Sequence, residues 1–233
     1  MASFSDLRDE YIARVVKGKT FADVGGLWGT VNEKASVAFR EGATTITMID
    51  VTPEGEQLWQ KFHNRMHEME ISEYQCISTD ICNHNILEWV QPFEVVHCAG
   101  VLYHHPHPLL MINALKTITK EHLILTSAIT QQTIENEKGK YTIPASGIIF
   151  VPALSEDERS ILKVYWENKG VVALGLTQDS RFNLDNFGPW WWLPTPHVLT
   201  EMCKIVGFKI LDSNLTWGGN GFALLLQVQG DMG

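Results

Sequence analysis

Thr20-Phe-Ala-Asp-Val-Gly-Gly-Leu-Trp-Gly-Thr30 is the stretch that decides the fold of this 233-residue chain. An apolar run, typical of a buried parallel strand, breaks into glycines and then into a helix start. Gly25, Gly26 and Gly29 lack a Cβ, so they adopt backbone angles closed to other residues and let main-chain N–H groups approach a ligand. The stretch therefore predicts a strand and a turn that deliver a nucleotide-like ligand.

The residues after the glycines predict the first crossover helix. Thr30 followed by Glu33 is the pattern of a capping box, which starts a helix that runs to about Arg40. Gly42 then ends it.

Two further strands end in acids. The strand Thr45–Val51 carries Asp50, at about the spacing where a dinucleotide or nucleoside fold places an acid on the ribose hydroxyls. The strand Tyr74–Ile81 carries Asp80, whose carboxylate can accept an adenine amino group, and then Ile81, suited to packing on the purine face. The turn and one acid leave open a nicotinamide or an adenosyl cofactor.

The fourth strand makes the pattern specific. It runs from Phe93 to Gly100 into Val101-Leu-Tyr-His-His-Pro-His-Pro108. In this order and spacing, the four segments resemble the class I S-adenosylmethionine-dependent methyltransferases. The phrase Cys98-Ala-Gly-Val-Leu-Tyr-His104 is very similar to that family's post-strand motif. The resemblance covers about residues 20–130, with Gly26-Leu-Trp28 in place of the usual Cys-Gly-Thr.

The resemblance implies S-adenosylmethionine as the cofactor. The nearest branch includes the tRNA wobble-uridine carboxymethyltransferases and many small-molecule methyltransferases. Trp28 is a candidate for a cation–π contact with the cationic sulfur, and Cys98 and Ala99 are expected to offer backbone groups. The implied cofactor-binding residues are Asp23, Gly25, Gly26, Leu27, Trp28, Asp50, Val51, Asp80, Ile81, Cys98, Ala99 and Val101.

His104 matches the family's histidine and is the first choice for a catalytic residue, a base if the acceptor is a hydroxyl or carboxylic group. The run His104-His-Pro-His107 also suggests a metal, but adjacent residues rarely ligate one ion, so no metal is expected. His97, inside the fourth strand, is interpreted as a packed or hydrogen-bonded core residue rather than a ligand. The expected substrate-binding residues are Tyr103, His105, Trp190 and Trp191.

Strands alternate with helices along the chain, which predicts an α/β fold: a Rossmann-like, doubly wound, mostly parallel seven-stranded sheet. We expect helices at about Ser5–Val16 and Leu109–Ile118, and a fifth strand at Glu121–Ile129. Another helix is expected to start at Thr52-Pro53, with Thr52 as its cap and Pro53 in its first turn. Thr195-Pro196 caps a last helix that ends at Gly207. Two runs, Phe208–Trp217 and Phe222–Val228, then predict a closing antiparallel hairpin.

Residues 130–194 are too many for a structureless connection. Ser155 with Glu158 is a second capping box and predicts a helix from about Glu156 to Asn168. Three consecutive tryptophans, Trp190 to Trp192, cannot all point inward from one strand or turn, so at least one is expected to face a cleft or a partner. We expect one domain over 1–233, in which 130–194 is an inserted cap that shapes the acceptor pocket.

The composition and net charge of the chain limit the kinds of partner that we expect it to bind. A hydrophobic content of 45% suits one sizeable core. The net charge of −9, from 18 basic and 27 acidic side chains, disfavours RNA and favours a small-molecule acceptor. No apolar run reaches about 18 residues and the start is polar, so no membrane contact and a cytoplasmic location are expected. The four cysteines show no metal-type pairing and are expected to be reduced packing residues.

Four functions remain open from the sequence. The first is a methyltransferase that transfers a methyl group to a small molecule by in-line displacement. The second is a tRNA-modifying methyl- or carboxymethyltransferase, which predicts a basic surface near the pocket. The third is an NAD-dependent oxidoreductase, for which the first turn and Asp50 also serve. The fourth is a binding module that holds the cofactor without turnover.

Overall fold

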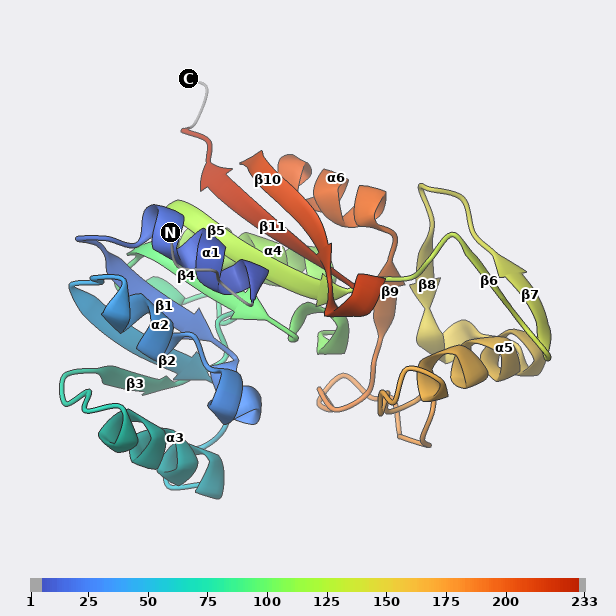
Figure 1. Ribbon diagram of the computed structural model, residues 1–233, viewed down its shortest axis with the longest axis horizontal. Helices are drawn as coiled ribbons and strands as arrows, with labels where there is room; N and C mark the ends of the chain where they lie inside the picture. The colour runs from blue at the N-terminus through green and yellow to red at the C-terminus, as the bar shows by residue number, and fades with distance from the viewer. Residues whose placement is uncertain (1–5, 231–233) are drawn as a thin grey trace.

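A seven-stranded sheet forms the body of the molecule in a computed structural model that describes residues 6–230 (Figure 1). Its strand order is β10-β11-β5-β4-β1-β2-β3, and the first five strands along the chain run parallel. This confirms the predicted Rossmann-like, mostly parallel sheet. The strands are β1 (Thr20–Val24), β2 (Thr45–Asp50), β3 (Gln75–Ser78), β4 (Phe93–Ala99), β5 (Thr119–Ala128), β10 (Phe208–Thr216) and β11 (Gly221–Val228).

Helices cover both faces of the sheet (Figure 1). On one face lie α1 (Leu7–Val15), α2 (Ala35–Arg40) and α3 (Gln57–Glu68). On the other face lie α4 (Pro108–Thr117) and α6 (Pro196–Val206). The helix expected from Ser5 begins at Leu7 with Asp6 as its N-cap, and Ser5 itself is outside the described residues.

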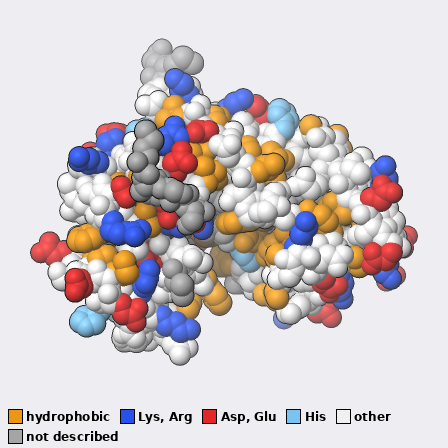
Figure 2. All heavy atoms as spheres, viewed as in Figure 1, with side chains coloured by type: hydrophobic (Ala, Val, Ile, Leu, Met, Phe, Trp, Pro, Cys, Tyr) orange, Lys and Arg blue, Asp and Glu red, His pale blue; other side chains and the backbone are white. Residues whose placement is uncertain are grey.

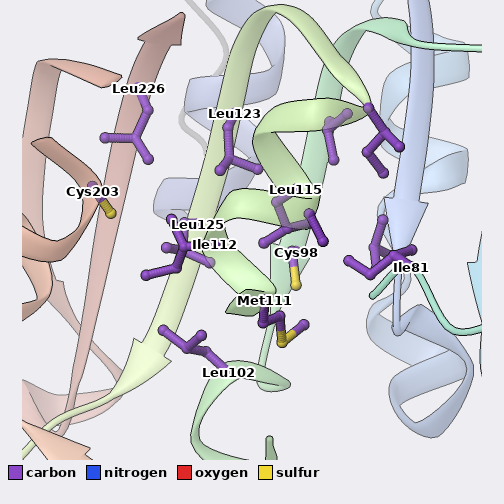
Figure 3. Close-up of a cluster of buried hydrophobic side chains, with 14 of the residues drawn as sticks. Ile81, Cys98, Leu102, Met111, Ile112, Leu115, Leu123, Leu125, Cys203 and Leu226 are labelled. Atoms are coloured by element: carbon purple, nitrogen blue, oxygen red, sulfur yellow. The ribbon is translucent and has the colours of Figure 1, made fainter. Parts of the chain in front are cut away.

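The main core lies between β4, β5, α4 and α6. Figure 3 shows Leu115 of α4 close to Cys98 of β4 in the middle of this cluster, and Cys203 of α6 at its other side, near Leu226 of β11. Alternation along β4 points Val96 and Cys98 into this core, whereas Val95 packs against α1 and α2 on the opposite face, which His97 shares. All four cysteines lie in the described part and have free thiols, as expected.

Two predicted helix starts are wrong. Thr30 does not cap a helix, because its hydroxyl donates to the Leu27 carbonyl inside a 3₁₀ segment, η1 (Gly26–Asn32). The carboxylate of Glu33 instead accepts from Ser36 N, at 2.8 Å, in the first turn of α2. Thr52 does not start α3, because its N–H and hydroxyl both donate to Asp50, and the helix begins only at Gln57. In each case a nearby acceptor competes for the predicted cap.

The predicted end of the chain is confirmed. The Thr195 hydroxyl accepts from Val198 N at the start of α6, and Gly207 ends the helix with a φ of 101°. β10 and β11 then pair antiparallel, and β11 pairs antiparallel with β5. No helix in residues 6–230 is long and apolar enough to cross a membrane.

Residues 130–194, which we call the cap, fold beside the sheet (Figure 1). They contain two antiparallel strand pairs, β6 (Thr133–Asn136) with β7 (Gly139–Thr142) and β8 (Ile148–Phe150) with β9 (Trp192–Pro194). The helix α5 (Glu156–Glu167) starts at the predicted capping box of Ser155 and Glu158. The cap has its own hydrophobic cluster. Figure 2 shows the surface hollowed between sheet and cap, with hydrophobic and histidine side chains in the hollow.

Candidate active site

A cavity of about 320 Å³ opens at the carboxyl ends of β1 and β4, where ligands bind in open α/β sheets. Its lining combines the glycine turn, the end of β4 and residues from both ends of the chain. The lining residues are Arg8, Asp23, Gly25, Gly26, Gly29, Asn32, Glu33, His97, Ala99, Gly100, Tyr103 and Trp217.

The glycine turn needs glycine at two positions. Gly25 has a φ of 76°, and a Cβ there would lie 2.3 Å from Cγ2 of Val101. A Cβ on Gly26 would lie 2.6 Å from Oδ2 of Asp23. Gly29 has a φ of −108° and open space around it. The backbone of the turn therefore packs tightly against β4 and Asp23, as a ligand cradle requires.

Asp23 and His97 form a buried pair at the base of the cavity. Nδ1 of His97 lies 2.7 Å from Oδ1 of Asp23, and Lys34 N donates to Oδ2 at 2.8 Å. The two residues are register neighbours on β1 and β4. Nε2 of His97 is buried and has no hydrogen-bond partner among the described residues. The pair thus leaves one ring nitrogen buried and unpartnered in a residue that lines the cavity.

Asp50 ends β2 next to the glycine turn, because Gly25 N donates to the Ile49 carbonyl at 2.8 Å. Oδ1 of Asp50 accepts from Thr52 N at 2.9 Å and from the Thr52 hydroxyl at 2.7 Å. Oδ2 is buried without a partner in the described chain. A bare buried carboxylate oxygen is costly unless a ligand supplies a donor, and a ribose hydroxyl is such a donor.

Arg8, a residue of α1, places its positively charged guanidinium in the cavity lining. Its Nε and Nη2 bond the carboxylate of Asp6, and its guanidinium lies 5.9 Å from the Trp217 ring centroid. Burial acts to raise the pKa of Asp6, but hydrogen bonds from Arg8 and Lys34 outweigh it and hold that pKa well below its usual value. Asp6 therefore stays ionised and fixes Arg8 at the cavity wall.

Asp80 lies beyond β3 and is exposed, and its carboxylate accepts from Cys82 N at 2.8 Å, which closes a local turn. Asp80, Cys82 and His105 hold potential ligand atoms within 4.8 Å of one another. However, His107 N donates to Nδ1 of His105, which leaves the proton on Nε2. Neither ring nitrogen then offers an ion a lone pair unless that hydrogen bond breaks.

Tyr103 and His104 follow β4 but face different neighbours. Burial raises the pKa of Tyr103 to about 12, so its hydroxyl stays protonated in the cavity wall. His104 bonds the cap through Nδ1 and the Gly188 carbonyl, 2.9 Å apart. Burial lowers its pKa against the opposing effect of the carbonyls of Gly188 and Pro189. His104 therefore ties the cap to the sheet as a neutral ring.

The tryptophans lie mainly inside the cap. Trp190 and Trp191 are both buried, and Trp190 packs against Tyr103 and Trp166 with ring centroids 4.7 and 5.0 Å away. Trp191 N donates to the Tyr103 carbonyl at 2.7 Å. Trp192 is half-buried and stacks on Phe150. This wall of the cap supports Tyr103 from behind.

Of the predicted site residues, the structure gathers Asp23, Gly25, Gly26, Ala99 and Tyr103 in the cavity lining. Among residues 6–230, that lining does not include His104, His105, Trp190 or Trp191. In the described part of the chain, the lining also leaves out the other expected cofactor residues. Leu27, Ile81 and Cys98 are buried in hydrophobic clusters, the Val101 side chain lies against Gly25, Asp50 is buried, and Trp28, Val51 and Asp80 are exposed.

Sequence reasoning missed Arg8, Asn32, Glu33, His97 and Trp217 in the cavity lining. One signal was available for His97, because it lies two residues before Ala99 on the same face of the strand. Arg8 and Trp217 give no such signal, since they approach the cavity from opposite ends of the chain.

No family model matches the chain, but solved structures share its fold. Magnesium protoporphyrin IX methyltransferase from Synechocystis PCC 6803, solved with bound SAH, has a TM-score of 0.59 and 14% identity over 95% of this chain and 82% of its own. The chain has the class I methyltransferase fold. An O-methyltransferase family protein from Burkholderia thailandensis has a TM-score of 0.61 and 12% identity, over 97% of this chain and 55% of its own. The fold expected from the resemblance is thereby confirmed.

A curated relative points to the same group. Ubiquinone biosynthesis O-methyltransferase from Actinobacillus pleuropneumoniae serotype 5b (strain L20) is 28% identical over 132 residues, which are 55% of this chain and 54% of the relative. The chain thus spans about half the length of this relative.

Proposed function

We propose that this chain is an S-adenosylmethionine-dependent methyltransferase acting on a small-molecule acceptor. The observation that carries the proposal is the bare, buried Oδ2 of Asp50 beside the tightly packed Gly25-Gly26 turn. Ligands of open α/β sheets bind at the carboxyl ends of the strands, a similar structure was solved with bound SAH, and the names of the similar proteins are those of methyltransferases.

The chain's own residues suit each part of that cofactor. Asp50 accepts hydrogen bonds from the ribose hydroxyls. Asp80, which follows the neighbouring strand β3, accepts a hydrogen bond from the adenine amino group. Arg8 faces the methionine carboxylate, with Nη1 free of hydrogen bonds to the described residues. When bound, S-adenosylmethionine supplies a methyl group activated by its sulfonium. The buried walls around Tyr103 exclude water and position the acceptor, which provides most of the rate if the acceptor is already nucleophilic.

A small acceptor fits the charges of the cavity better than RNA does. Its lining holds two acids, Asp23 and Glu33, and one cation, Arg8, which Asp6 already pairs. Recognition of a phosphate backbone relies on several cations. Ubiquinone biosynthesis and magnesium protoporphyrin IX, named for two of the similar proteins, involve small molecules. The residue roles, including that of His104, and the cytoplasmic location stay predictions.

Calorimetric titration with S-adenosylhomocysteine, and in parallel with NADH, tests the proposal. The wild type is expected to bind only the adenosyl ligand. Asp50→Asn should weaken that binding at least about tenfold, because a charge-assisted hydrogen bond is worth about 1.5–3 kcal/mol. Asp179→Asn, at an exposed acid, is the matched control and should bind like the wild type. Binding of NADH instead, or of neither ligand, would refute the proposal.

A further inference from the structure

The buried pair Asp23–His97 lies where the proposed cofactor places its methionine end, between the tips of β1 and β4. The adenine and ribose are assigned to β3 and β2, so the cavity at β1 and β4 receives the amino acid part and the acceptor. Asp23 would be the obvious partner for an ammonium group. Its two oxygens are already used, one by His97 and one by Lys34 N.

His97 therefore carries the hydrogen-bonding capacity of Asp23 into the cavity. Asp23, when ionised, accepts the proton of Nδ1, so neutral His97 keeps a lone pair on Nε2. That nitrogen is buried and unpartnered among the described residues, and the ring lines the cavity. A carboxylate behind an imidazole makes the far nitrogen a stronger acceptor. An unmet acceptor of this kind calls for a cationic donor.

We infer that Nε2 of His97 accepts a hydrogen bond from the α-ammonium group of the cofactor's methionine end. The inference rests on the proposed function. The charges around the cavity agree with it, because Arg8 lies in α1 and can face the carboxylate, while Asp23 supplies negative potential behind His97. The charges of the cavity are thus complementary to a zwitterionic amino acid group. In this arrangement the His97 imidazole bonds the ammonium group on one side and Asp23 on the other.

The substitution His97→Asn tests the role of Nε2 separately from the bond between Nδ1 and Asp23. The Asn amide N–H occupies the place of Nδ1 and can still donate to Asp23, while nothing replaces Nε2. Calorimetry should show S-adenosylhomocysteine bound about tenfold to a hundredfold more weakly than by the wild type. 5′-Methylthioadenosine, which lacks the amino acid part, should bind both proteins equally. His122→Asn, at a half-buried histidine of β5, is the matched control and should change neither affinity.

A third ligand separates the ammonium from the carboxylate. S-Adenosylhomocysteine without its α-amino group should bind the wild type more weakly, and His97→Asn should weaken it no further. Equal losses for S-adenosylhomocysteine and 5′-methylthioadenosine would overturn the inference, since they indicate a collapsed site. Unchanged binding of S-adenosylhomocysteine would overturn it as well.

Failure of the proposed function looks different. In that case the wild type binds none of the three adenosyl ligands, and the inference falls with it. If the wild type binds all three but the His97 variant shows no selective loss, the proposed function stands and only the role of His97 is refuted.

Discussion

Asp23 and Asp50 end neighbouring parallel strands, and both are almost fully buried, but their carboxylates are used differently. Asp23 bonds His97 and Lys34 with its two oxygens. Asp50 bonds Thr52 with one oxygen and leaves the other bare. The first acid therefore builds the site and acts through a neighbour, whereas the second is free for a ligand. Burial alone does not distinguish the two roles, but their hydrogen-bond partners do.

The largest expected effect tests this contrast directly. Asp23→Asn removes the negative charge and turns one acceptor oxygen into an amide N–H, which either opposes Lys34 N–H or forces His97 into its other tautomer. Urea denaturation should show a loss of about 3 kcal/mol in the free energy of unfolding, because the hydrogen bonds from His97 and Lys34 to a buried carboxylate are both weakened when its charge is removed. Asp50→Asn keeps the bond to Thr52 and should change stability by less than about 1 kcal/mol. Equal losses in the two variants would contradict the comparison.

The next effect concerns the glycine turn that lies between the two acids. Gly25→Ala forces a side chain into a left-handed backbone, with φ 76°, and against Val101. We expect a loss of about 2 kcal/mol in unfolding free energy and much weaker binding of S-adenosylhomocysteine. Gly29→Ala, at a residue with open surroundings, should lose less than about 0.5 kcal/mol. Equal tolerance at both positions would show that the turn relaxes freely.

A smaller effect should appear where the cap meets the sheet. Burial holds the pKa of His104 below 6.5, its ordinary value. The unfolded chain therefore binds a proton at a higher pH than the folded chain, so His104 contributes stability above pH 6.5 that is lost as the pH falls through the folded pKa. The free energy of unfolding should therefore decrease as the pH is lowered from 6.5 through the folded-state pKa of His104.

His104→Asn should flatten that pH dependence, because it removes the titrating ring while the Asn amide N–H takes the place of Nδ1 and can still donate to the Gly188 carbonyl. Part of the slope should remain, since burial also lowers the pKa of His105. Urea denaturation between about pH 5 and pH 8 measures the difference. A slope identical to that of the wild type would show that His104 titrates as in the unfolded chain.

The sequence could predict what local patterns determine. The glycine turn, Asp50 at the end of β2, the Ser155 capping box and the Thr195 cap each depend on residues within one turn of the chain. Predictions failed where two local partners compete: Thr52 is taken by Asp50, and Thr30 by the Leu27 carbonyl. The cavity lining was harder to predict, since Arg8, His97 and Trp217 meet only after the sheet and its hairpin have formed. Their juxtaposition depends on packing across the whole chain.

The smallest expected effect concerns Trp28, which follows the glycines and was expected to lean over the cofactor's sulfur. In the structure its side chain is 81% exposed, and its neighbour Leu27 is the one that packs inward. A ring that lies in solvent gives up little when removed, so Trp28→Ala should change unfolding free energy by less than about 0.5 kcal/mol. Calorimetry should show S-adenosylmethionine bound as in the wild type. A selective loss for S-adenosylmethionine, with S-adenosylhomocysteine unaffected, would instead mean that the loop closes and places the ring against the sulfonium charge, because only the former ligand carries it.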